Sequence, residues 1–299
     1  MPTSQGAIRL FRFAGIDVFL HWSWFVIALY QIQRPSAYGS PVWKVAEYLA
    51  LFAIVTLHEF GHSLACRQVG GNAERIVLWP LGGVAYVDPP QRPGATLWSI
   101  AAGPLVNVVL VPVLYGLMLV GGSAGLAETS PDASAWLGMV FTINVVLLVF
   151  NLLPVYPLDG GQILRSLLWF VLGRARSLTA ASALGFVGVL GLLAIAFRAG
   201  DAWLGILAAF VAMNCWQGFQ HSRALSRLAS LPRRSGYSCP SCRQAPPLGS
   251  FWACGACGAP FDTFETGGRC PSCRADFGEG RCVDCGRLTP IGDWLRPEA

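Results

Sequence analysis

Charged residues are scarce in this sequence. Arg, Lys, Asp and Glu make up 12% of its 299 residues, whereas soluble domains carry about 25%. Lysine occurs once, at Lys44. The basic residues are spread along the chain rather than gathered in a block, which argues against the usual kind of nucleic-acid-binding surface. Hydrophobic residues reach 54%, so the composition is that of a membrane protein.

Cysteine is unevenly distributed and marks a domain boundary. Of the ten cysteines, only Cys66 and Cys215 lie in the first 238 residues, and the others all form C-x-x-C pairs. The chain is mostly apolar up to about Arg227 and becomes polar and glycine-rich after the segment SLPRRSG. We therefore expect a membrane domain over residues 1–228, a linker over 229–237 and a cysteine-rich domain over 238–290.

Long apolar runs predict the transmembrane helices. A helix that crosses a bilayer needs roughly 20 apolar residues, and the segments that meet or approach this length are 18–33, 43–66, 97–121, 135–155, 179–197 and 201–220. With the N-terminus inside, the outer loops carry Arg34, Lys44 and Arg198, and every other basic residue up to Arg234 falls on the inner side. Because cytoplasmic loops are enriched in Lys and Arg, we expect a multi-pass cell-membrane protein with its N-terminus and its cysteine-rich domain in the cytoplasm.

The stretch HEFGH places three ionisable groups inside an apolar run. Positions i and i+4 share a helix face, so His58 and His62 can hold one zinc ion, with Glu59 beside them as a proton acceptor. Such residues at membrane depth are functional by default, although polar groups bonded between helices are the simpler alternative. A catalytic zinc needs a third protein ligand. Asp159 is the acid whose expected depth matches the histidines, unless it caps the helix that begins near Gln162.

At these motifs the sequence resembles the site-2 proteases, a family of intramembrane zinc metalloproteases. The resemblance covers about residues 8–220 and rests on four motifs, which are HEFGH at 58–62, LWPLGGVA at 78–85, AAGPLVN at 101–107 and N-x-x-P-x-x-P-L-D-G-G at 151–161. It implies a zinc ion on His58, His62 and Asp159, and a zinc-bound water activated by Glu59 as general base. It also implies cleavage of membrane-anchored proteins within or near their transmembrane segments. Gln162 departs from the basic residue that is more often expected at its position.

A substrate helix must unwind before attack, so its backbone then needs new hydrogen-bond partners. Residues 75–87 read as two short β-type runs around the sequence PLGG. They predict a membrane-associated hairpin whose edge, at Gly82 and Gly83, pairs with an extended substrate. A purely structural re-entrant loop is the alternative.

Amide side chains inside the apolar segments are a second set of candidates for substrate binding. Asn107 and Asn151 match the family motifs, and Asn144 lies seven residues before Asn151 on the same helix face. We expect these amides either to bond substrate carbonyls or to join helices to one another.

The C-x-x-C pairs CPSC, CGAC, CPSC and CVDC are a strong zinc signal. The order CPSCR then C-x-x-C-G occurs twice, so we expect a tandem zinc ribbon in which the first pair shares a zinc with the second and the third with the fourth. A cross-braced pairing of the first with the third is the alternative. Four thiolates leave no open coordination position, so both sites are structural. The expected ligands are Cys239, Cys242, Cys254, Cys257, Cys270, Cys273, Cys282 and Cys285.

The sequence therefore predicts an all-α polytopic membrane protein of about six transmembrane helices, with a short membrane-associated β-hairpin and a small zinc-ribbon domain. The resemblance implies an endopeptidase of regulated intramembrane proteolysis, with one catalytic and two structural zinc ions, acting in the lipid bilayer on membrane-anchored substrates such as anti-sigma factors. The ribbons are expected to bind a cytosolic part of a substrate or a partner, or to be a passive appendage, and no nucleic acid is expected. A metal carrier or sensor, with ligands along a path across several spans, and a catalytically silent binding module are the competing hypotheses.

Overall fold

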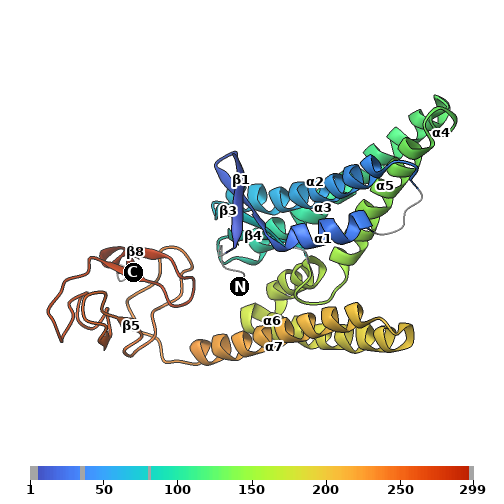
Figure 1. The fold of residues 1–299 in the computed structure, drawn as a ribbon. Helices are drawn as coiled ribbons and strands as arrows, with labels where there is room; N and C mark the ends of the chain where they lie inside the picture. The colour runs from blue at the N-terminus through green and yellow to red at the C-terminus, as the bar shows by residue number, and fades with distance from the viewer. Residues whose placement is uncertain (1–5, 34–37, 80–81, 296–299) are drawn as a thin grey trace. The chain divides into compact units, whose positions relative to one another are not determined.

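The computed structural model describes residues 6–33, 38–79 and 82–295 (Figure 1). Contacts divide the chain into two compact units, which we call the membrane unit and the ribbon unit. The membrane unit comprises Met1–Gly173 and Ser177–Gly218, and the ribbon unit comprises Arg174–Arg176 and Phe219–Ala299. This division falls inside a helix, not in the expected linker 229–237.

Four helices in the described part of the chain are long and apolar enough to cross a membrane. They are α2 (Pro41–Gln68), α3 (Pro93–Ser123), α5 (Pro131–Leu152) and α6 (Asp159–Ala199). The first three begin with a proline, whose fixed φ and missing N–H suit the first helical position. These helices coincide with the second to fifth of the expected spans.

The first expected span, 18–33, is not one helix. Residues Ile16–His21 form strand β2, and α1 (Ser23–Gln33) has 11 residues. Such a helix is about 17 Å long, which is short of a hydrocarbon core of about 30 Å. The apolar run was misread because buried and half-exposed residues alternate in IDVFLH, which is the period of a strand. The sixth expected span, 201–220, overlaps the first part of α7 (Ala202–Ala229).

The membrane unit contains a four-stranded sheet in the order β1-β2-β3-β4. β1 (Ala7–Phe13) pairs antiparallel with β2, β2 parallel with β3 (Asn72–Trp79), and β3 antiparallel with β4 (Gly82–Asp88). The hairpin predicted over 75–87 is confirmed, with Leu78 opposite Gly83. Pro80 and Leu81, at its turn, lie outside the described residues. The N-terminal hairpin was not predicted, and its turn has positive φ at Ala14 and Gly15.

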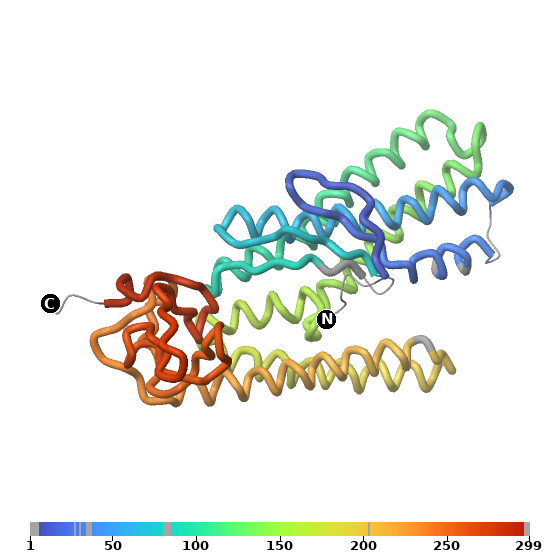
Figure 2. The backbone as a smooth tube through the Cα atoms, turned by 60° about the vertical axis from the view of Figure 1, so that its left-hand side comes forward, coloured from blue at the N-terminus to red at the C-terminus, as the bar shows by residue number. Residues whose placement is uncertain are grey.

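The sheet packs on α2, which carries the HEFGH stretch (Figure 2). Ile16, Val18, Ile76 and Leu78 are fully buried in the same cluster as Phe60 of α2. The parallel pairing of β2 with β3 fixes this face, because it aligns Val18 with Ile76 and Leu20 with Leu78. The sheet is thereby held against the helix turn that bears the ionisable residues.

Helix α6 is interrupted in its middle. At Gly173 the backbone has φ 77° and ψ 171°, so a shorter helix that starts at Asp159 is followed by a second one. Earlier in the chain, the short helix α4 (Leu126–Thr129) lies between α3 and α5. The fifth expected span, 179–197, lies entirely in the second part of α6.

The ribbon unit is built around one core. It contains two short hairpins, β5 (Trp252–Ala253) with β6 (Pro260–Phe261) and β7 (Glu279–Arg281) with β8 (Leu288–Pro290), and then a 3₁₀ turn over Ile291–Trp294. Trp294 is fully buried and packs with Trp252, Phe261 and Phe264. The cysteine-rich region is thus one domain rather than two tandem units.

The predicted pairing of the C-x-x-C motifs is wrong. The structure forms two groups of four cysteines. The first and fourth motifs make one group, which is Cys239, Cys242, Cys282 and Cys285. The second and third motifs make the other, which is Cys254, Cys257, Cys270 and Cys273. The N-terminal and C-terminal parts of the domain meet, because Ser238 N donates to Trp294 O at 2.7 Å. This contact brings the first motif beside the fourth, and each site still combines one CPSCR motif with one C-x-x-C-G motif.

The residues expected to form a linker are bonded to the ribbon. Leu248 N donates to Pro232 O at 2.9 Å, and Arg234 N donates to Pro246 O at 2.9 Å. The Arg233 guanidinium forms an ion pair with Asp284, which lies inside the CVDC motif, at 2.6 Å. The segment therefore leads directly into the ribbon fold.

Candidate active site

His58, Glu59 and His62 lie on one turn of α2 and are almost completely buried. Each of the three residues is 6% exposed. The two histidine rings stand edge to face with centroids 4.7 Å apart, as the i, i+4 spacing predicts. Gly61, between them, lets α3 approach, since a Cβ there would lie 2.6 Å from Ala102 O.

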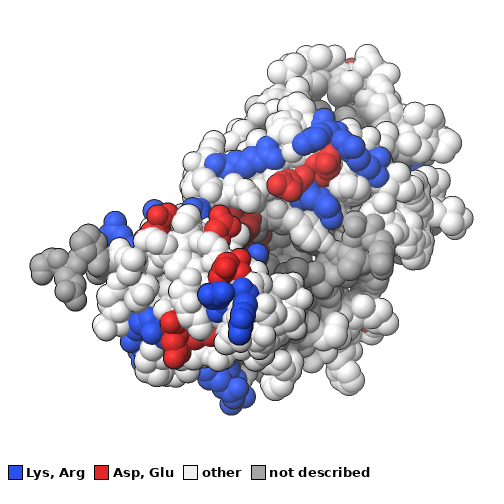
Figure 3. Space-filling view, turned by 90° about the vertical axis from the view of Figure 1, so that its left-hand side faces the viewer, with Lys and Arg blue, Asp and Glu red and all other residues white. Residues whose placement is uncertain are grey.

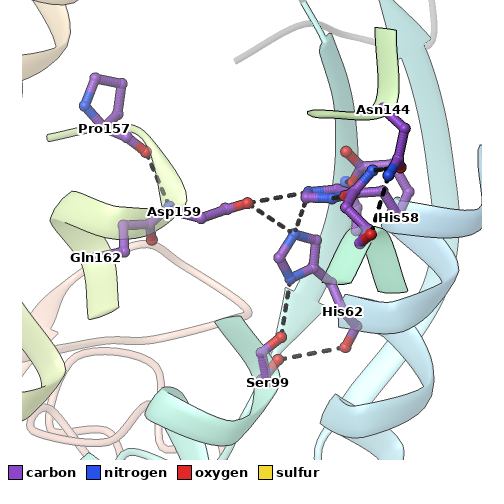
Figure 4. A network of polar contacts seen from close by, with 10 residues as sticks. His58, His62, Ser99, Asn144, Pro157, Asp159 and Gln162 are labelled. Carbon is purple, nitrogen blue, oxygen red and sulfur yellow. Dashed lines mark hydrogen bonds and ion pairs between the residues drawn. The ribbon is translucent and has the colours of Figure 1, made fainter. Parts of the chain in front are cut away.

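Asp159 reaches the histidines from the beginning of α6. The chain turns sharply after α5, and Gly160 and Gly161 are needed there: a Cβ would lie 2.3 Å from Leu152 O at the first and 2.4 Å from Tyr156 N at the second. The N-cap of α6 is Leu158, with no side-chain cap. The alternative of Asp159 as a helix cap is therefore wrong, and its carboxylate points at the histidines instead (Figure 4).

Three donor atoms converge at this point. His58 Nε2 lies 3.0 Å from Asp159 Oδ2 and 3.1 Å from His62 Nε2, and the third distance, His62 Nε2 to Asp159 Oδ2, is 3.4 Å. Ligand atoms of a tetrahedral zinc ion, about 2.0–2.1 Å from the metal, are about 3.3 Å apart. The three atoms therefore fit three corners of a zinc site and leave the fourth position to another ligand.

The opposite ring nitrogens are held by hydrogen bonds, as the second contacts of metal-binding histidines usually are. His58 Nδ1 donates to Asn107 Oδ1 at 2.6 Å, and His62 Nδ1 donates to Ser99 O at 2.9 Å. With the proton on Nδ1, each ring directs the lone pair of Nε2 toward Asp159. Both acceptors come from α3, so this helix sets the orientation of both rings.

Gly103 of α3 makes room for the two rings. A Cβ at this position would lie 2.3 Å from His62 Nε2 and 2.8 Å from His58 Nε2. In the sequence, Gly103 stands out only as part of the AAGPLVN motif, which does not predict this role. A glycine in an apolar helix is the signal that could have pointed to a close approach.

Two of the buried amide side chains, Asn107 and Asn144, join helices, which is one of the two roles expected of them. Asn107 is fully buried, with its Oδ1 on His58 and its Nδ2 donating to Asn144 Oδ1 at 2.8 Å. Asn144 Nδ2 in turn donates to Asn107 O at 3.0 Å, which joins α3 to α5. Asn151 is half-buried near the end of α5. Substrate binding by Asn107 and Asn151 remains a prediction.

Glu59 has a partner in the sheet. Its Oε2 accepts a hydrogen bond from Ala85 N of β4 at 3.0 Å. Gly83, two residues earlier on the same strand, is a predicted substrate-binding residue, and Gly82 precedes it. Glu59, the candidate base, is therefore bonded through Ala85 to the strand that is predicted to bind substrate.

Glu47, another buried acid of α2, does not join the cluster. Its carboxylate accepts from Gln31 Nε2 at 2.8 Å and from Tyr38 OH at 2.7 Å. Burial, together with the hydrogen bond and the charge of Glu47, raises the pKa of Tyr38. Glu47 thus ties α1 and the chain that follows it to α2.

The ribbon unit offers two further possible zinc sites. Paired sulfur atoms lie 3.7 Å apart in the outer site, formed by the first and fourth motifs, and 3.5 and 3.8 Å apart in the inner site. Tetrahedral thiolates about 2.3 Å from zinc are about 3.8 Å apart. The hydrogen bond between Cys242 and Cys282 lowers the pKa of the Cys242 thiol to about 5 and raises the pKa of the Cys282 thiol. Cys257 and Cys273 of the inner site are exposed.

Replacing Asn107 by alanine is expected to weaken zinc binding in the membrane unit by about 10–100-fold. His58 Nδ1 would lose its acceptor, and the ring would no longer be held in its orientation. The zinc ions retained per chain, titrated against a chelator, give the measurement. Asn144→Ala is the control, because it leaves Asn107 Oδ1 in place, and it should weaken binding much less. Equal retention by Asn107→Ala and unaltered protein would contradict the role.

The family model described as peptidase family M50 matches residues 46–133 and 122–195, a stretch that includes His58, Glu59, His62 and Asp159. The chain belongs to peptidase family M50. With four helices long and apolar enough to span a bilayer, this M50 protein is a membrane protein.

Individual relatives agree with this assignment. A zinc metalloprotease of Methanocaldococcus jannaschii is 34% identical over 179 residues, which are 60% of this chain and 50% of that protein. Rip3 of Mycobacterium tuberculosis is 31% identical over 223 residues, 69% of this chain and 56% of that protein. The M50 chain therefore spans between half and two thirds of the length of these relatives.

A solved structure has a similar fold. The site-2 protease from Methanocaldococcus jannaschii superposes with a TM-score of 0.51 at 28% identity, and the match covers 71% of this chain and 95% of that one. The likeness supports a site-2 protease fold for the membrane unit of this M50 protein.

Proposed function

We propose that this M50 protein is an intramembrane zinc endopeptidase. The observation that carries the proposal is the convergence of His58 Nε2, His62 Nε2 and Asp159 Oδ2 within 3.4 Å of one another, from helices that are apolar enough to cross a bilayer. Glu59 follows His58 directly and supplies the base that hydrolysis needs. The names of the relatives, which include a zinc metalloprotease and a site-2 protease, support the same activity.

Each residue of the site has its own role in the proposed hydrolysis. His58, His62 and Asp159 hold the zinc ion, which supplies a Lewis acid that polarises a carbonyl and makes water a nucleophile near neutral pH. Glu59 accepts a proton from the attacking water and passes it to the leaving amine of the cleaved peptide bond. Asn107 and Ser99 keep the two histidine rings in position through Nδ1.

The substrates are membrane-anchored proteins whose transmembrane segments unwind locally. An unwound segment carries free N–H and C=O groups, which are costly in a membrane unless they find partners. The edge of β4 at Gly83, with Gly82 beside it, accepts such a segment by strand addition, and Asn151 adds an amide contact. This is the chemistry of regulated intramembrane proteolysis.

The ribbon unit binds two structural zinc ions and lies in the cytoplasm together with the N-terminus. Arginine and acidic side chains are interspersed on the face drawn in Figure 3, and this mixture does not suit nucleic acid. The unit binds a cytosolic part of a substrate or a partner protein.

The potential metal ligands of the membrane unit lie in one place, which argues against a metal carrier. In the described part of the membrane unit, one group of three potential ligands was found, formed by His58, His62 and Asp159. A transport path needs successive sites. A base next to the metal ligands, as Glu59 is, serves hydrolysis rather than transport.

Glu59→Gln is expected to lower the rate of peptide-bond hydrolysis by about 10²–10⁴-fold while zinc remains bound. The amide keeps the size of the side chain but cannot accept the proton. The measurement compares the membrane proteomes of cells that carry unaltered or Glu59→Gln protein under several stresses. Single-span proteins or their membrane stubs should accumulate only with Glu59→Gln.

The same comparison separates the competing functions. A metal carrier or a binding module would keep its function in Glu59→Gln cells, so identical proteomes under every condition, with zinc still bound, would contradict the protease. Glu47→Gln is the matched control because it changes a buried glutamate of the same helix outside the cluster.

A further inference from the structure

The hydrogen bond between Glu59 and β4 occupies a backbone group that strand addition would use. Glu59 Oε2 accepts from Ala85 N at 3.0 Å, and Glu59 is 6% exposed. The bond therefore forms in a buried place, where a polar contact is worth more than in water. A charged acceptor makes it stronger than a bond between two neutral peptide groups.

The N–H of Ala85 faces the edge of β4 that does not pair with β3. β4 is the last strand of the order β1-β2-β3-β4, so β3 is its one strand neighbour in the described sheet. Successive residues of a strand direct their N–H and C=O groups to opposite edges. Because Ala85 N bonds Glu59, the groups of Gly83, Ala85 and Val87 point away from β3.

An extended segment that added to this edge would bring its own carbonyl to Ala85 N. Strand addition works through main-chain bonds to every second residue of the edge. Glu59 Oε2 and a substrate carbonyl would then compete for one donor. Gly83 and Val87 lie on either side of Ala85 and direct their groups to the same edge.

We infer that Ala85 N–H is shared in turn between the two partners: Glu59 holds it in the free protein, and an extended substrate segment takes it on binding and so releases the Glu59 carboxylate. The inference rests on the proposed proteolytic role. A substrate segment that stays helical cannot take the N–H, so Glu59 stays bound to the strand. Release of the base thus depends on unwinding, which is a positioning role for the Ala85 peptide group.

The test is a double-mutant cycle on the zinc-loaded full chain in detergent micelles. The probe is a fluorescent ten-residue peptide of alternating Val and Thr, and its affinity is read by anisotropy while mass spectrometry shows it intact. The variants are Glu59→Ala, Ala85→Pro and both together. Proline removes the N–H and is tolerated on an edge strand where the N–H is outside the ladder. Val87→Pro, with and without Glu59→Ala, is the matched control at a free-edge residue that does not hold Glu59.

Competition predicts that Glu59→Ala binds the peptide about tenfold more tightly, because the peptide no longer displaces a charge-assisted bond. The gain should be absent when Ala85 is proline and present when Val87 is proline. Glu59→Gln, which keeps a neutral acceptor, should fall between Glu59→Ala and the unaltered protein. This order of affinities tests the inference even where Ala85→Pro does not fold.

Two results would overturn the inference. An unchanged affinity in Glu59→Ala shows that Glu59 does not compete for the N–H, and a tenfold gain that persists in the Ala85→Pro background places its cause elsewhere. Failure of every variant to bind the peptide would also remove it, together with strand addition. Cleavage of a membrane-anchored substrate by the unaltered protein in the same micelles reports separately on the proposed protease.

Discussion

Gly103→Ala is expected to abolish zinc binding at His58, His62 and Asp159, and peptide hydrolysis with it. The added Cβ would lie 2.3 Å from His62 Nε2 and 2.8 Å from His58 Nε2, far inside van der Waals contact. The Cβ belongs to the backbone of α3 and cannot rotate away. Both rings must therefore move, and a metal site tolerates displacements of only about 0.5 Å.

Zinc content per chain gives the direct measurement for Gly103→Ala. One zinc ion should be lost while the ribbon zinc ions stay, and hydrolysis should fall to the background of Glu59→Gln or below. Gly116→Ala, on the same helix, is the matched control, since nothing lies within 4 Å of its Cβ. Alanine in a helix interior is about 0.5–1 kcal/mol more favourable than glycine, so the control should bind zinc normally. Full zinc content in Gly103→Ala would refute the proposed close packing.

Two double substitutions in the ribbon unit are expected to remove different numbers of zinc ions. Cys239 and Cys282 belong to the same site, so Cys239→Ser with Cys282→Ser should lose one zinc ion. Cys239 and Cys254 belong to different sites, so serine at both should lose two. A tandem arrangement of the motifs would reverse the two results. That reversal would contradict the pairing of the first motif with the fourth and of the second with the third.

Loss of both ribbon zinc ions should unfold the unit. Apparent zinc-binding free energies of about 10–16 kcal/mol hold small zinc domains folded, and one core, with Trp294 fully buried, is shared by both sites. Native mass spectrometry of the two double variants counts the ions, and limited proteolysis follows the unfolding. The inner site should release its zinc to a chelator first, because Cys257 and Cys273 are exposed. Simultaneous release from both sites would contradict this order.

The sequence by itself predicted the group of His58, His62 and Asp159 and most of the helices. His58 and His62 are four residues apart, and a helix places such residues on one face without help from the rest of the chain. The apolar runs that became α2, α3 and α5 are long enough to exclude other structures. Asp159 was predicted because acids are few and its expected depth matches that of the histidines. The β3–β4 hairpin was equally local, since its two runs flank one turn.

Only the tertiary structure decided what depends on contacts between distant segments. The run at 18–33 became a strand and a short helix because β2 pairs with β3, more than 50 residues later along the chain. The grouping of the first C-x-x-C motif with the fourth follows from the bond between Ser238 and Trp294, which spacing within the repeat cannot express. Gly103 under the histidines, Asn107 on His58 and Ala85 on Glu59 are likewise set by the packing of α3 and β4 on α2. Local pattern selects the elements, but burial on partners far along the chain selects their contacts.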